Sequence, residues 1–146
     1  MPAPPPTVEL APLIAGVEQV AAADEAIRFV YLFGSRARGT SGARSDVDLA
    51  VARTGEPDLM ADARLHDALA AALGTDAVDV LLLLRAPLWL QFRVVGEGVV
   101  LYSRDERARI AFREDVTHRF LDFRPYYDEY LAHVRDRARR GVLSGG

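Results

Sequence analysis

A short run rich in glycine and arginine follows an apolar segment early in the chain. It contains Gly34, Ser35, Arg36 and Arg38. Glycine lets backbone amides approach a ligand closely, and a serine at the start of a helix adds a hydroxyl group to such an anion-binding turn. Arginine side chains can add charge-assisted hydrogen bonds to phosphate oxygens. We therefore predict that these four residues bind phosphate groups.

Three aspartates form a second candidate group. Asp46 and Asp48 alternate along a predicted strand, so their carboxylates project from the same face. Asp79 interrupts an otherwise apolar strand, where a carboxylate without a partner is costly to bury. Like charges on one face are destabilising unless a cation offsets them, and carboxylate oxygens are ligands for hard cations. If the two strands are neighbours, Asp46, Asp48 and Asp79 are expected to bind metal, with two Mg²⁺ ions as the expected complement.

A phosphate-binding turn beside a set of carboxylates is suited to metal-dependent transfer from a nucleoside triphosphate. One ion accompanies the triphosphate, and the other lowers the pKa of the attacking hydroxyl group. Asp76 is a second candidate for the third carboxylate, although its position favours an ordinary turn residue. The order of the chain leaves the choice between Asp76 and Asp79 open, with Asp79 preferred.

The spacing of these groups resembles a known signature. Gly-Ser at 34–35, then ten residues, then Asp-Val-Asp at 46–48 is similar to the GS-x10-DxD motif of the polymerase-β-like nucleotidyltransferase superfamily. The spelling Gly-Ser-Arg-Ala-Arg-Gly, followed by Ser-Asp-Val-Asp-Leu-Ala-Val, resembles its minimal, stand-alone branch, the MNT proteins. The likeness extends over residues 10–102.

This resemblance implies a nucleotidyltransferase (polymerase-β palm-like) fold and Mg²⁺-dependent transfer of AMP from ATP. By position, Gly34 and Ser35 would hold the triphosphate, Asp46 and Asp48 would bind metal, and Asp79 would position or deprotonate the acceptor hydroxyl. MNT proteins act as antitoxins of HEPN ribonuclease toxins, so the resemblance implies a HEPN toxin as the partner and one of its tyrosines as the acceptor.

Two other functions remain open from the sequence. The same chemistry could modify a small hydroxylated molecule, such as an aminoglycoside. A protein with inherited but idle acids could instead neutralise a toxin by binding alone.

The elements that must position these groups follow from apolar periodicity and turn residues. The alternation of helices and strands predicts an α/β (α+β) fold with a small mixed β-sheet and flanking helices. We expect a disordered lead over 1–9, a nucleotidyltransferase core over 10–102 and a pair of C-terminal helices over 103–141. The expected elements are helices over 10–20, 57–73, 87–95, 103–121 and 125–141, and strands over 27–33, 46–52, 77–84 and 98–102.

Two features define the expected C-terminal pair. Ser103 and Glu106 have the spacing of a capping box that opens the first of these helices. Pro125 is expected to begin the second, because proline is favoured in a first helical turn.

Composition narrows the class of protein. The 146 residues suffice for one domain, and the absence of cysteine excludes disulfides and thiolate metal sites. A net charge of −3 argues against direct nucleic-acid binding. The first basic residue is Arg28, and no apolar run approaches the ~18 residues of a membrane span. We therefore expect a cytoplasmic protein.

Overall fold

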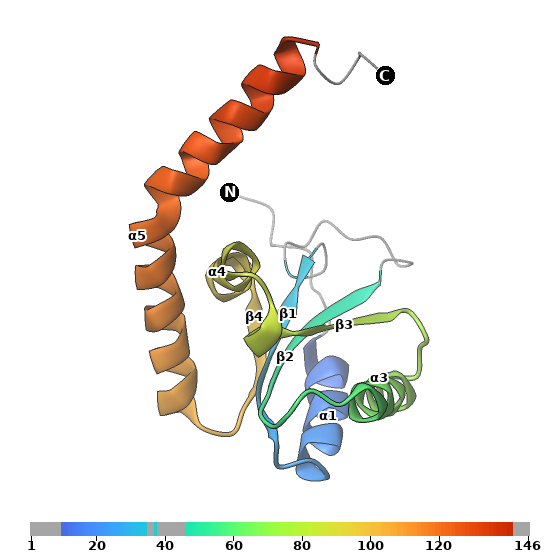
Figure 1. Cartoon of the computed structure of the whole chain (residues 1–146). Coiled ribbons are helices and arrows are strands. Elements are labelled where there is room, and N and C mark those ends of the chain that lie inside the picture. Colours follow the sequence, from blue (N-terminus) through green and yellow to red (C-terminus); the bar gives the residue numbers. More distant parts are fainter. Residues whose placement is uncertain (1–9, 35–36, 38–45, 142–146) are drawn as a thin grey trace, which may run out of the picture.

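The computed structural model describes residues 10–34, 37 and 46–141. They form three layers, with a four-stranded sheet between two layers of helices (Figure 1). The strands are β1 (Ile27–Phe33), β2 (Val47–Arg53), β3 (Val78–Leu82) and β4 (Val99–Ser103). Their order across the sheet is β3-β2-β1-β4. β1 pairs antiparallel with β2 and β4, whereas β2 and β3 are parallel. The predicted α/β fold with a small mixed sheet is therefore confirmed.

Helices cover both faces of this sheet (Figure 1). On one face α1 (Leu10–Ala22) and α3 (Leu59–Leu73) pack against alternate residues of the central strands, such as Leu49. On the other face lie α4 (Leu88–Glu97) and α5 (Glu106–Arg139), whose buried residues meet the remaining side of β1 and β2. Because β1 and β2 are covered on both sides, they are almost continuously apolar, as expected for central strands.

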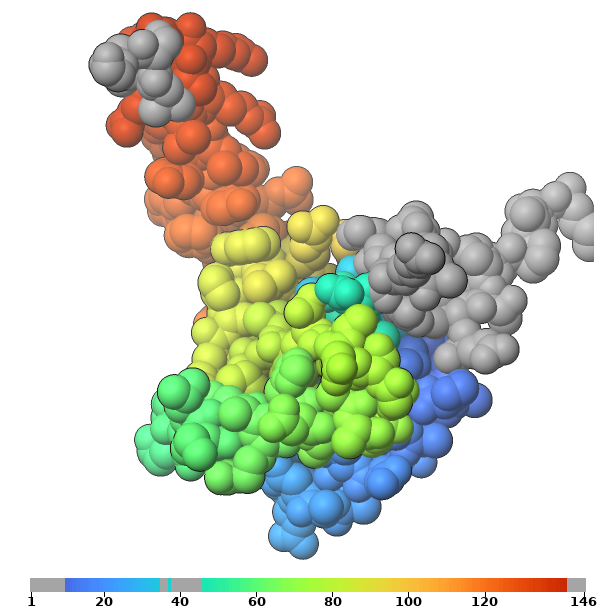
Figure 2. Space-filling view, turned by 90° about the vertical axis from the view of Figure 1, so that its right-hand side faces the viewer, coloured from blue at the N-terminus to red at the C-terminus, as the bar shows by residue number. Residues whose placement is uncertain are grey.

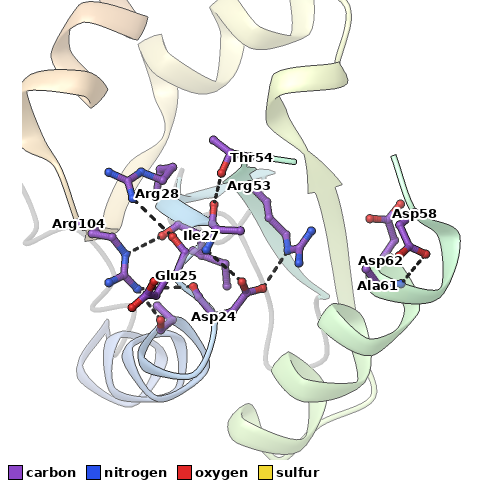
Figure 3. Close-up of polar contacts among 12 residues, drawn as sticks. Asp24, Glu25, Ile27, Arg28, Arg53, Thr54, Asp58, Ala61, Asp62 and Arg104 are labelled. Atoms are coloured by element: carbon purple, nitrogen blue, oxygen red, sulfur yellow. Dashed lines mark hydrogen bonds and ion pairs between the residues drawn. The ribbon is translucent and has the colours of Figure 1, made fainter. Parts of the chain in front are cut away.

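A polar cluster fixes one end of the sheet, where β1 begins and β2 ends (Figure 3). The Asp24 carboxylate accepts hydrogen bonds from the Ala26 amide and from Nε of Arg53, at 3.1 and 2.9 Å. Arg104, just after β4, donates to the carbonyl oxygens of Ile27 and Ala21. The arginine thereby binds a carbonyl at the C-terminus of α1, where helix carbonyls lack partners. These contacts tie α1, β1, β2 and β4 together and leave the opposite end of the strands for the site.

The predicted pair of C-terminal helices is wrong: α5 is one helix that continues through Pro125. Proline removes one backbone hydrogen bond and crowds the preceding turn, which can kink a helix without ending it. Residues 121–126 are all exposed, so solvent can satisfy the carbonyl left without that hydrogen bond. α5 changes direction partway along its length (Figure 1).

The start of α5 also differs from the predicted capping box. Asp105 is the N-cap, and its carboxylate accepts a hydrogen bond of 3.1 Å from the Ala108 amide. Ser103 instead ends β4. Asp105 rather than Ser103 caps the helix because its carboxylate lies one residue before the helix, where anions also interact favourably with the helix dipole.

The predicted third strand, over 77–84, is shorter in the structure. β3 ends at Leu82, and residues Leu83–Arg85 form a 3₁₀ turn before α4. Leu83 is fully buried, and its carbonyl accepts a hydrogen bond of 2.9 Å from the Gln91 side chain. An apolar run thus continues beyond the strand because the turn packs into the core. Among the described helices, none combines the length and apolarity needed to cross a bilayer.

Glu106, in the first turn of α5, forms an ion pair with Arg109. Arg109 also donates a 3.0 Å hydrogen bond to the Tyr31 hydroxyl, so its buried guanidinium links α5 to the centre of β1. The hydrogen bonds from Arg109 lower the pKa of the Glu106 carboxyl from an ordinary 4.5 to about 2. The same pairing raises the pKa of Arg109.

This ion pair predicts a pH-dependent contribution to stability. Because the folded-state pKa of Glu106 is depressed, its contribution is complete above about pH 4.5 and is lost as the pH falls toward 2. We expect Glu106→Gln to lower the melting temperature at about pH 7 but to have little effect near pH 2. Thermal melts of both proteins at several pH values measure this. A gap between the two melting temperatures that stays constant across the range would contradict it.

Candidate active site

Two of the predicted acids lie side by side at one end of the sheet. Asp48, the second residue of β2, is in register with Asp79 on the parallel neighbour β3. Asp48 is also opposite Phe33, the last residue of β1. Register partners on neighbouring strands project from the same face, so the three side chains form a row across the sheet. The expectation that the strands bearing Asp48 and Asp79 are neighbours is therefore confirmed.

The row lies on the face that α4 and α5 cover. Ala50 and Ala52, which alternate with Asp48 along β2, pack in the core cluster that includes α4. Asp48 is half-buried, whereas Asp79 on the outer strand is exposed. Figure 2 shows β3, in yellow-green, on the outer surface of the molecule. Asp48 is thus the inner carboxylate and Asp79 the one that an incoming group can reach.

The third predicted carboxylate lies next to this row. Asp46 directly precedes β2 and is exposed. The Val47 amide donates a 2.9 Å hydrogen bond to the Ala77 carbonyl, which brings the start of β2 beside the start of β3. Asp76 is exposed in the connection before β3. The strand register pairs Asp79, rather than Asp76, with Asp48.

Gly34 follows β1 directly and closely approaches Asp48. Its backbone has a φ of +74°, a conformation that residues with a side chain rarely adopt. A Cβ atom at this position would lie 2.3 Å from Oδ2 of Asp48. The space that a side chain would fill therefore holds the carboxylate, so both the turn and the position of Asp48 require glycine. The other predicted phosphate-binding residues, Ser35, Arg36 and Arg38, lie outside the described residues.

A cavity of about 240 Å³ adjoins this row on the α4 side. Leu90 and Val94 supply apolar walls, and at the rim Arg93 pairs with Glu97 at 3.6 Å. Apolar walls with a few polar groups are typical of small-ligand sites, so this cavity could hold part of a ligand beside the acids. No motif in the sequence marks α4 as part of the site, although the i, i+4 spacing of Arg93 and Glu97 indicates one polar face. The lining residues are Phe33, Gly34, Leu90, Arg93, Val94 and Glu97.

Metal binding is consistent with the donor chemistry of the site. Carboxylate oxygens are suitable ligands for Mg²⁺. The Asp48 carboxylate keeps its position because residue 34 is glycine, whereas a side chain there would displace it. Within residues 10–34, 37 and 46–141, no three histidine or carboxylate side chains are grouped closely enough to hold an ion. Because like charges repel, such carboxylates are expected to gather only around a cation. The metal ligands therefore stay a prediction.

Comparison with known families gives a match over most of the core. The family model described as "Polymerase beta, Nucleotidyltransferase" matches residues 16–107, from α1 to the first turn of α5. The matched region contains the turn at Gly34 and the three aspartates.

A characterised relative matches a similar length of chain. The protein adenylyltransferase MntA of Shewanella oneidensis is 31% identical over 118 residues, covering 79% of this chain and 84% of that protein.

Solved structures show the same fold. A chain in the crystal structure of a toxin–antitoxin with AMP-PNP is 26% identical, with a TM-score of 0.65, covering 81% of this chain and 98% of that chain. A structure described as a tri-AMPylated S. oneidensis HEPN toxin in complex with MNT antitoxin matches at 23% identity with a TM-score of 0.60. That match covers 84% of this chain and 98% of the other, and at this identity the likeness is one of fold.

Proposed function

Because the chain belongs to the polymerase-β nucleotidyltransferase family, we propose that it transfers AMP from ATP to a hydroxyl group of a partner protein. The observation that carries this proposal is the register that sets Asp48 beside Asp79, with Gly34 against the Asp48 carboxylate. Both features lie at the end of the sheet where β1 ends and β2 begins.

The choice of ATP is supported by two relatives. The 31% identical MntA is named a protein adenylyltransferase, and the toxin–antitoxin structure with the highest TM-score given above contains AMP-PNP. By the resemblance of the motif, the turn at Gly34 and Ser35 would hold the triphosphate, with Ser35, Arg36 and Arg38 donating hydrogen bonds to its oxygens. The α4 cavity beside Phe33 would then accommodate another part of the substrate.

Asp46, Asp48 and Asp79 would hold Mg²⁺, with two ions as the expected number. When bound, the metal would neutralise triphosphate charge and lower the pKa of the attacking hydroxyl. The half-buried Asp48 has its position set by both neighbouring strands. Because Asp79 is exposed, it would be the carboxylate that meets an acceptor arriving from outside.

The proposed reaction exchanges one phosphorus–oxygen bond for another. The acceptor oxygen attacks the α-phosphorus of ATP and forms a new P–O bond. The bond between the α-phosphorus and the bridging oxygen breaks, and pyrophosphate leaves with the electron pair. Asp79 positions the acceptor hydroxyl or takes its proton, which then passes to solvent.

The acceptor is proposed to be a tyrosine of a HEPN toxin, which would make this chain an antitoxin. The open position of Asp79 favours an acceptor that arrives on a folded protein. α5 leaves the body of the protein and places no helical layer over β3 (Figure 1). The exposed position of Asp79 suits a small acceptor such as an aminoglycoside less well, because small ligands are usually held in enclosed pockets. AMP on a tyrosine near the toxin's active site would repel and obstruct RNA by its charge and bulk.

The Asp79→Ala variant tests this proposal. We expect it to lose AMP transfer while retaining most of its affinity for Mg²⁺-ATP, because Asp79 is assigned to the acceptor rather than to the phosphates. Intact-mass spectrometry of a HEPN toxin co-expressed with each variant measures transfer, and calorimetry measures ATP binding. Asp76→Ala is the matched control and should transfer AMP normally.

Each alternative function gives a different result in the same experiment. Neutralisation of the toxin without added nucleotide mass, by wild type and Asp79→Ala alike, would support the non-catalytic reading. Transfer of radiolabel from ATP to an aminoglycoside, but not to the toxin, would support the small-molecule acceptor. Wild-type transfer by Asp79→Ala would remove Asp79 from the mechanism.

A further inference from the structure

The second half of α5 stands clear of the rest of the molecule (Figures 1 and 2). The first half is anchored: Val116 is fully buried, and the Phe120 ring stacks on Phe92 of α4 with centroids 4.1 Å apart. From residue 121 to 139 every side chain is exposed except two, Tyr127 and Leu131, which are half-buried. Packing in the core of this chain therefore does not explain the apolar residues of this segment.

Five of the seven large apolar residues in this segment fall on one face of the helix, whereas Leu121 and Tyr126, 50% and 68% exposed, lie at least about 100° from Tyr127. We define the α5 stripe as the residues Phe123, Tyr127, Tyr130, Leu131 and Val134, which recur at spacings of three and four. Phe123, Tyr130 and Val134 are 47%, 63% and 44% exposed. The stripe continues the face that carries Val116 and Phe120, so one apolar face is covered by the body in its first half and uncovered in its second.

Aromatic contacts connect the stripe to the anchored part of the helix. The Tyr127 ring lies 6.1 Å from Phe120 and 6.4 Å from Phe123. These rings therefore form a continuous row that begins at the contact with α4. Tyrosine and phenylalanine that are ordered before binding lose little conformational entropy when a partner covers them, which favours their use in interfaces.

Charge is distributed unevenly around the same segment. At about 100° per residue, the carboxylates lie about 100° to 180° from Tyr127, away from the stripe. Two of them are paired along the helix, Asp128 with Arg124 on one flank and Asp136 with Arg140 on the back. Arg135 and Arg137 lie about 80° to either side of Tyr127 and so border the stripe. The carboxylates concerned are Asp122, Asp128, Glu129 and Asp136.

From this arrangement we propose that the α5 stripe is the docking surface for the acceptor protein, and that it receives an apolar helix or groove bordered by carboxylates. The proposal rests on the proposed function, because the partner is the protein that carries the acceptor hydroxyl. Aromatic side chains supply the contact area, and Arg135 and Arg137 pair with acids at the rim of the partner.

Two other occupants fit the stripe less well. A second copy would bring the arginine borders of two stripes together, and like charges across an interface are unfavourable. RNA would need more positive charge, since residues 121–140 carry five arginines against four carboxylates. The carboxylates on the back of α5 leave the segment close to neutral.

The test measures binding without ATP. A HEPN protein from the same genome is titrated into the full chain and into the triple variant Phe123→Ala/Tyr130→Ala/Val134→Ala. We expect the variant to bind at least about 10-fold more weakly, because truncated aromatic contacts at the centre of an interface commonly cost that much. Its melting temperature should match wild type, since the three side chains are exposed.

The matched control lies on the back of the same helix. Asp122→Ala/Glu129→Ala/Asp136→Ala truncates three exposed side chains there and should bind the HEPN protein as wild type does. Equal binding by the stripe variant and wild type would overturn the docking surface. The docking surface would also be overturned if the chain alone formed a dimer, or bound a labelled RNA, and the stripe variant lost that association while the control variant kept it. Tight binding by wild type with no AMP transfer in Mg²⁺-ATP would instead overturn the proposed function and leave the docking surface standing.

Discussion

Asp48→Asn is expected to lower AMP transfer by about 100-fold or more, because loss of a carboxylate that holds metal removes both a ligand and its charge. Asparagine has nearly the same shape, so the residue can keep its place between Phe33 and Asp79 in the sheet. The fold should therefore survive while Mg²⁺-dependent ATP binding weakens. Calorimetry of ATP binding with and without Mg²⁺, together with intact-mass assays of the acceptor, measures both effects.

The control for this variant is Asp76→Asn, which makes the same chemical change at an exposed position before β3. It should leave transfer and metal-dependent binding unchanged. If Asp48→Asn also kept wild-type binding of Mg²⁺-ATP, the metal assignment would be wrong. A collapse of the circular dichroism spectrum would mean that Asp48 is structural, and a loss of activity would then carry no mechanistic meaning.

Gly34→Ala is expected to have the second-largest effect, through two separate causes. A side chain at a φ of +74° costs about 1 kcal/mol in backbone strain. The added Cβ would also come within 2.3 Å of Oδ2 of Asp48, so the carboxylate must turn away. We expect transfer to fall by about 10- to 100-fold, the range seen when a group that orients a metal ligand is lost.

A second glycine separates these two causes. Gly74, which ends α3, has a nearly equal φ of +68°, and nothing lies within 4 Å of the place where its Cβ would be. Gly74→Ala should therefore lose a similar amount of stability in urea melts while keeping full transfer activity. If both variants lost activity equally, the effect of Gly34→Ala would come from destabilisation alone and not from Asp48.

The sequence by itself determined the kind of site and most of the elements. The motif from Gly34 to Asp48 indicated the family that the family model then matched over residues 16–107. The strand over Ile27–Phe33 was predicted with the bounds that the structure has. Such inferences succeed because alternation, apolar runs and turn glycines are local properties, readable from neighbouring residues.

The C-terminal helix differs from the prediction based on local sequence patterns. Pro125 was interpreted as a helix start, whereas the helix passes through it. Proline has the same fixed φ in the first turn as in the interior, so the residue alone does not distinguish the two positions. The deciding factors were the contacts that hold the preceding turns, such as Phe120 on Phe92, and the solvent that surrounds the turn at Pro125.

The site itself was decided by contacts between residues that are distant in the chain. Only the parallel pairing of β2 with β3 sets Asp48 opposite Asp79, and a shift of one residue would have turned Asp79 to the other face. The approach of Gly34 to Asp48 and the cavity formed with α4 likewise depend on how the layers pack. Residue types and spacing specify which chemistry is available, whereas strand register and packing specify which atoms meet, because those are properties of the whole folded chain.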